Sequence, residues 1–122
     1  MSIKLATALG GNVDSAVATL GDGQPSWSAN ANLGPGAIVI SSTAGTTVTV
    51  NIQSSIDAVT WVNQPYALIA TPTTFVTTAL TITTTVTTIY LIQAPAQPSP
   101  YAYLKLVLSA NTGMTLTAAY YY

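Results

Sequence analysis

The 122-residue chain contains no cysteine, histidine, arginine or glutamate. Without cysteine it forms no disulfide, and without cysteine or histidine it has no zinc, haem or iron–sulfur site of the usual type. Two lysines and three aspartates make up only 4% of the residues, so no basic surface is available to neutralise nucleic-acid phosphates. We therefore expect no metal, no cofactor and no nucleic-acid partner.

The few charged residues form no catalytic pattern. They are Lys4, Lys105, Asp14, Asp22 and Asp57. Asp57 is expected to make a turn, because an aspartate readily hydrogen-bonds to nearby backbone N–H groups. Lys105 falls in the middle of a predicted strand, where it is expected to be solvated or to protect a sheet edge. Asp14 and Asp22 lie in a loop-rich segment, where a weak cation site is the alternative to turn formation. The chain is not expected to be an enzyme.

Long apolar runs are also missing. The longest weakly polar stretch, residues 71–93, has threonine at eleven positions, so no window of about 18 apolar residues exists to cross a membrane. Residues 1–11 include a lysine and only a short apolar run, which lacks the apolar region of a signal peptide. We expect a protein made in the cytosol, with no membrane partner. The hydrophobic share of 49% argues against disorder.

Threonine and alanine dominate what is present, with 21 and 18 residues. Threonine is β-branched and favours strands over helices. Apolar and polar residues alternate with the period of two that is typical of half-buried strands. The predicted strands are residues 37–41, 46–56, 59–62, 66–70, 73–93 with a break near 83–85, 101–108 and 114–122. This spacing predicts an all-β fold, an antiparallel β-sandwich or jelly-roll-like domain.

Turn residues and strand parity add detail to this prediction. Residues 57–58 are expected to close a hairpin, and residues 111–113 (Asn-Thr-Gly) are expected to join the last two strands as a second hairpin. Side chains of shared parity should form the core. The predicted core consists of Val48, Val50, Ile52, Trp61, Leu80, Ile82, Leu104, Leu106, Leu108 and Leu116.

The N-terminal segment differs in composition from the rest. Residues 1–36 hold six of the eight glycines, so we divide the chain into an N-terminal arm or loop-rich segment, 1–36, and a β-sandwich domain, 37–122. The arm is expected to become ordered across a neighbouring subunit. Its apolar anchors would be Ile3, Leu5, Leu9 and Trp27. The alternative is that the arm folds back as an edge strand of its own sandwich.

The C-terminal aromatic residues are further candidates for contact with a partner. They are Tyr120, Tyr121 and Tyr122. Successive strand side chains point to opposite faces, so at least one of these rings should face outward, and tyrosine is common at interfaces. Trp27, Trp61 and exposed tyrosines could alternatively stack on sugars.

Two stretches resemble small structural proteins of tailed bacteriophages. Residues 50–61 have an alternating strand followed by Ser, an Asp turn and Thr-Trp. Residues 101–108, followed by 111–113 and 116–118, are similar to the closing hairpin of those β-sandwich decoration, cement or tail-associated proteins. The resemblance spans roughly residues 46–122. It departs at Ala58, where the pattern usually has glycine.

The resemblance implies a virion structural protein, most specifically a capsid decoration (cement) protein on the outer surface of the capsid. Such a protein would bind the major capsid protein and itself, usually as a homotrimer, and would stabilise the head by bridging capsid subunits. Composition independently favours a fixed assembly, because charge is depleted at interface cores. The alternatives are a carbohydrate- or surface-binding module of a phage tail or baseplate, and a non-viral secreted adhesin.

Overall fold

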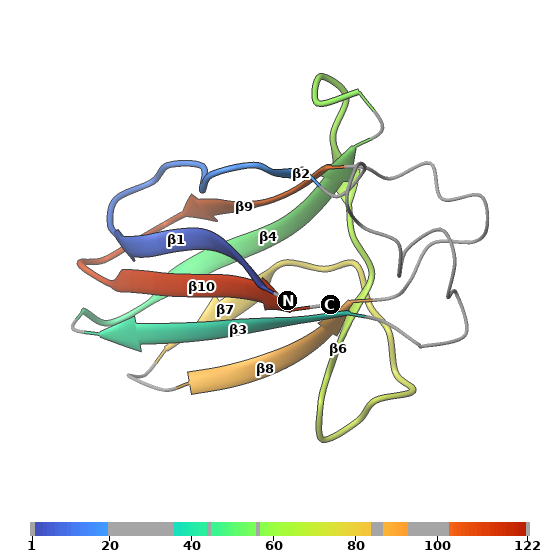
Figure 1. The fold of residues 1–122 in the computed structure, drawn as a ribbon. Helices are drawn as coiled ribbons and strands as arrows, with labels where there is room; N and C mark the ends of the chain where they lie inside the picture. The colour runs from blue at the N-terminus through green and yellow to red at the C-terminus, as the bar shows by residue number, and fades with distance from the viewer. Residues whose placement is uncertain are drawn as a thin grey trace.

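The computed structural model describes residues 2–19, 36–43, 45–55, 57–83, 87–92 and 103–121. These residues form two packed antiparallel β-sheets and include no helix (Figure 1). The predicted all-β fold is therefore confirmed, and the arrangement is that of a β-sandwich. Because there is no helix in these segments, none of them supplies an apolar helix long enough to span a membrane.

The first sheet, sheet A, contains five strands, and every pair in it is antiparallel. In spatial order they are β1 (Ser2–Leu9), β10 (Thr115–Tyr121), β3 (Gly36–Thr43), β8 (Thr87–Ile92) and β6 (Tyr66–Leu68). The first and last described strands are thus neighbours, with Ser2 opposite Tyr121. Figure 1 shows the two chain ends close together at that end of the sheet.

The second sheet, sheet B, is built around β4. In spatial order it contains β2 (Ala18–Thr19), β9 (Tyr103–Ser109), β4 (Val48–Ser55) and β5 (Val62–Asn63), and β7 (Leu80–Ile82) also pairs with β4. One edge of β4 is paired with β9, and its other edge is shared between β7 and β5. The hairpin expected around residues 57–58 is present, because β4 pairs with β5 across it.

The core lies between the sheets and follows the predicted alternation. Buried and half-buried residues alternate along β4 and β9, as expected for strands with one face inward. Of the predicted core residues, Val48, Val50, Ile52, Leu80, Ile82, Leu104, Leu106, Leu108 and Leu116 are buried. Trp61 is only half-buried and lies outside the core cluster, so its assignment to the core is wrong.

The expected hairpin at residues 111–113 is not formed. β9 belongs to sheet B and β10 to sheet A, so this turn crosses between the sheets. It packs on another connection between the sheets, the one that joins β3 to β4. The Thr112 N–H donates to the Thr47 carbonyl at 2.9 Å, and the Thr47 N–H donates to the Thr112 hydroxyl at 2.9 Å. Strand pairing depends on residues far apart in the sequence, and β9 pairs with β4 instead of with β10, the strand that follows it.

Residues 2–9 of the predicted N-terminal arm belong to the sandwich. β1 pairs with β10, and Leu5 is 1% exposed in the core, so the alternative of an edge strand describes residues 2–9. The pairing register shifts between Lys4 and Ala6, and as a result the consecutive residues Leu5 and Ala6 are both buried. A bulge of this kind breaks the period of two, which is why the alternation did not identify this strand. Residues 20–35 lie outside the described part of the chain.

Candidate functional site

The outer face of sheet A divides into an apolar half and a hydroxyl half. Its apolar half, here called the sheet A patch, consists of Ala37, Val39, Ile89, Leu91, Ala119 and Tyr121. The strand register aligns Ala119, Val39 and Ile89 in one row across three strands. Tyr121, Ala37 and Leu91 form the adjacent row. Most of the patch is half-buried, and Tyr121 is 47% exposed.

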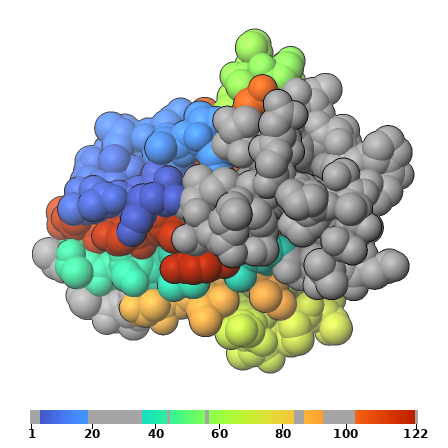
Figure 2. Space-filling model, viewed as in Figure 1, coloured from blue at the N-terminus to red at the C-terminus, as the bar shows by residue number. Residues whose placement is uncertain are grey.

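The other half of this face carries hydroxyl groups. Its residues are Ser41, Thr43, Thr87, Thr115 and Thr117. The hydroxyls of Ser41 and Thr87 lie 3.0 Å apart in a hydrogen bond between β3 and β8. Figure 2 shows β1, β10, β3 and β8 side by side across this face. Among the described residues of the face, only Lys4, opposite Ala119, is charged.

The candidate contact residues are distributed between the core and this patch. Leu5 and Tyr120 are buried in the core, so these two are not available to a partner, whereas Leu9 is half-buried and packs against the core. Ile3 takes part in the β1–β10 ladder opposite Tyr120. Tyr121 faces outward, which confirms that at least one C-terminal ring does so.

Two candidates fall outside the described residues: Trp27 and Tyr122. Their role as contacts stays a prediction.

The β4–β5 hairpin is organised by Asp57, as the turn assignment predicted. Its Oδ1 accepts hydrogen bonds from the backbone N–H groups of Thr60 and Val59, each at 2.8 Å, and from the Ser55 hydroxyl at 3.0 Å. These donors lower the pKa of the Asp57 carboxyl, with Thr60 contributing most. Ala58 has a φ of 62° and so occupies the left-handed region, a conformation that favours glycine.

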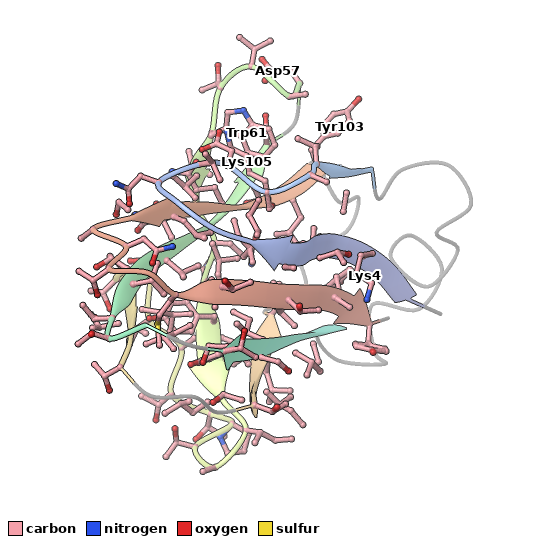
Figure 3. All side chains as sticks on the ribbon, turned by 90° about the vertical axis from the view of Figure 1, so that its left-hand side faces the viewer. Lys4, Asp57, Trp61, Tyr103 and Lys105 are labelled. Carbon is pink, nitrogen blue, oxygen red and sulfur yellow. The ribbon has the colours of Figure 1, made fainter. Side chains whose placement is uncertain are left out.

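Lys105 lies at the centre of a three-residue cluster on the outer face of sheet B. Its Nζ is 2.8 Å from Asp14 Oδ2 and 4.3 Å from the centre of the Trp61 ring. Figure 3 shows Lys105 and Trp61 close together below the hairpin that carries Asp57. The Lys105 side chain is only 13% exposed, and β9 is flanked by β2 and β4. The expectation of a solvated or edge-protecting lysine is therefore wrong.

The ion pair with Lys105 gives Asp14 a structural role. It ties the segment between β1 and β2 to β9, where Asp14 forms an isolated bridge with Val107. No group of three or more acidic residues that could hold a metal ion occurs within the described segments, and Asp22 lies outside them.

Amide side chains and Tyr103 lie around the Lys105 cluster on the outward face of sheet B. Gln53 is opposite Asn63 on one side and Lys105 on the other, so these three form one row across β5, β4 and β9. Asn51 lies one outward position further along β4, opposite Val107. Tyr103 precedes Lys105 on the same face of β9. Sequence reasoning missed this grouping, because the parity of each strand was clear but the pairing of β4 with both β9 and β5 was not.

Comparisons with known proteins add no assignment. Searches against protein-family models, curated proteins and solved structures find no significant match to this chain.

Proposed function

We propose that the protein is a structural subunit of a virion, a capsid decoration protein that docks on the outer shell through the sheet A patch. The observation that carries this proposal is the composition of the outer face of sheet A. Strands β3 and β8 there present Val39, Ile89 and Leu91 beside a group of hydroxyl side chains, and Lys4 is the charged residue among the described residues of this face. Solvated sheet faces are normally polar, so an apolar row supports contact with another protein.

Magnitudes favour docking by apolar burial over docking by charge. Complete burial of a valine, leucine or isoleucine side chain contributes about 1.5–3 kcal/mol, whereas an exposed ion pair contributes about 0–1 kcal/mol. The chain has five charged residues in all, and Asp14 and Lys105 already neutralise each other. Contacts with the major capsid protein and with other copies of the chain, as a homotrimer, would therefore be mainly apolar and hydroxyl-mediated.

Location on the particle tests the proposal directly. Virions whose genome encodes the chain are purified from culture on a density gradient. Antibodies raised against the recombinant chain are applied to them, and immunogold labelling is viewed by electron microscopy. Gold distributed over the heads is the expected result. Gold confined to tails or baseplates would support the alternative of a tail or baseplate binding module. Unlabelled particles, with the chain absent from them by mass spectrometry, would overturn the virion assignment.

A pair of variants tests the docking face. Ile89→Lys places a charge in the sheet A patch, and Thr87→Lys places the same charge one outward position away in the hydroxyl half. The Ile89 variant is expected to lose trimerisation in native mass spectrometry and to lose binding to undecorated heads, while the Thr87 variant retains both. Thermal unfolding of each variant verifies that the sandwich is intact. Equal behaviour of the two folded variants would contradict docking through the patch.

A further inference from the structure

The outer face of sheet B has a chemistry different from that of sheet A. One row across three strands contains Asn63, Gln53 and Lys105, and Asn51 lies beside this row on β4. The half-buried rings of Trp61 and Tyr103 belong to the same end of the sheet, close to the Asp57 hairpin (Figure 3). We refer to Asn51, Gln53, Asn63, Trp61 and Tyr103 as the sheet B platform.

The amides of the platform have unused hydrogen-bonding capacity. Within the part of the chain that the structure describes, the side chains of Asn51, Gln53 and Asn63 make no hydrogen bond to protein. Other amides of the chain are used structurally: the Asn111 side chain accepts from the Met114 N–H at 2.7 Å and donates to the Gly11 carbonyl at 3.0 Å. Each free amide offers both donors and an acceptor; Asn51 and Gln53 are half-buried and Asn63 is exposed.

The platform is electrically neutral. Lys105 is its only charged neighbour in the described row, and its ammonium is already held by Asp14 at 2.8 Å. The same ammonium lies 4.3 Å from the centre of the Trp61 ring, so it also fixes the position of that ring. The Asp57 carboxylate in the adjacent hairpin has no cationic partner among the described residues and would repel an anionic ligand, whereas a neutral ligand with many hydroxyl groups would meet amides and aromatic rings.

We propose that the sheet B platform binds a neutral oligosaccharide. Sugar hydroxyls donate to and accept from amide side chains, and the apolar C–H faces of a pyranose ring pack on aromatic rings that combine an apolar body with a polar edge. Asn63, Gln53 and Asn51 would bind the hydroxyls, while Trp61 and Tyr103 would contact the ring faces. Lys105 is a positioning residue, because it acts through the orientation of Trp61. This site lies on the sheet opposite the proposed docking patch and does not depend on that function.

Glycan binding is measured first with the fluorescently labelled full chain on an array that carries neutral and anionic glycans. The expected result is binding to neutral glycans with no preference for anionic ones. The strongest neutral oligosaccharide is then titrated by isothermal calorimetry in 0.15 M and 1 M NaCl. Affinity is expected to change less than twofold, because no charge pair between ligand and protein is screened.

Three variants locate the site. Gln53→Ala and Tyr103→Ala are each expected to weaken binding of that oligosaccharide at least fivefold. Thr81→Ala is the matched control, because Thr81 is an exposed sheet B residue on β7, in the row of Thr49 and away from the platform. Circular dichroism and the melting temperature confirm that each variant is folded.

Two results would overturn the proposal. One is the absence of binding to every neutral glycan on the array, or binding to anionic glycans alone. The other is an affinity that is the same in folded Gln53→Ala and Tyr103→Ala as in Thr81→Ala, which would place the saccharide elsewhere. In either case the outer face of sheet B would be structural, with the Lys105 cluster serving only to hold the hairpin and the N-terminal segment in place.

Discussion

Asp14 and Lys105 meet at 2.8 Å although they are 91 positions apart in the sequence. The two side chains differ in exposure to solvent: that of Asp14 is 52% exposed and that of Lys105 is 13% exposed. The carboxylate remains hydrated, whereas the ammonium depends on its protein partners. The two ends of this ion pair should therefore respond differently to mutation.

We predict that Asp14→Ala destabilises the fold more than Lys105→Met. Removal of Asp14 leaves a poorly hydrated ammonium without its carboxylate, at a cost of about 1–3 kcal/mol. Lys105→Met leaves a hydrated carboxylate and keeps an unbranched side chain against Trp61, at a cost of about 1 kcal/mol or less. Urea unfolding at pH 7 measures both free energies of unfolding. The reverse order would show that Asp14 contributes little to the environment of Lys105.

The hairpin should show an acid-dependent contribution to stability from Asp57. The pKa of this carboxyl is lowered below its ordinary value of 3.8, mainly by the Thr60 and Val59 N–H groups. The unfolded state therefore binds the proton more readily, so this stabilisation is complete above the unfolded pKa and is lost as the pH falls through the folded pKa. Asp57→Asn should lower the melting temperature at pH 7, and the difference from wild type should shrink at pH 2. A constant difference would contradict this role.

The first strand should be indispensable to folding. Leu5→Ala is expected to reduce the free energy of unfolding by about 2–5 kcal/mol, because Leu5 is fully packed in the core. Lys4→Ala, at the adjacent exposed position, is the control and should change it by less than about 0.5 kcal/mol. Deletion of residues 2–9 should abolish the cooperative thermal transition. A cooperative transition in the deletion variant would restore the interpretation of this segment as a separable arm.

Two glycines provide a matched test of packing. A Cβ added at Gly36 would overlap the Tyr120 ring, which is itself buried, whereas a Cβ at Gly10 would meet its nearest atom, the Met114 carbonyl oxygen, at 3.9 Å. Gly36→Ala should therefore cost about 1–3 kcal/mol. Gly10→Ala should be neutral or slightly stabilising. Equal melting temperatures of the two variants would mean that Tyr120 has room to move.

Assembly of the chain should be insensitive to salt. An interface formed by the sheet A patch and its neighbouring hydroxyls contains few charges to screen, so the oligomer should persist from low salt to 1 M NaCl. Sedimentation velocity at several salt concentrations measures this. Dissociation to monomers by salt alone would indicate an ionic interface and would contradict the proposed mode of docking.

Local pattern was sufficient to predict the strands whose alternation is unbroken. Val48–Ser55 and Tyr103–Ser109 have one apolar and one polar face, and both are strands with the predicted side inward. The Asp57 turn also followed from local chemistry, because its hydrogen bonds lie within a few residues. These elements required no knowledge of distant partners.

Features that depend on distant partners could not be predicted in this way. The turn at residues 111–113 has the composition of a hairpin, but its hydrogen bonds to Thr47 make it a crossing between sheets. The bulge in β1 interrupts the alternation of inward and outward residues, so a period of two does not identify Leu5 as an inward residue. The cluster of Asp14, Trp61 and Lys105 joins three separate segments, and only the assembled sheet brings them together.

The position of β10 between β1 and β3 has a consequence for biosynthesis. β10 is the last described strand to leave the ribosome, yet it is the only described strand with which β1 pairs. Until β10 has been synthesised, β1 and one edge of β3 lack the strand with which they pair, and Leu5 cannot be fully buried in the core. Sheet A can therefore be completed only after β10 has been synthesised, and until then the exposed strand edges are open to pairing with other nascent chains.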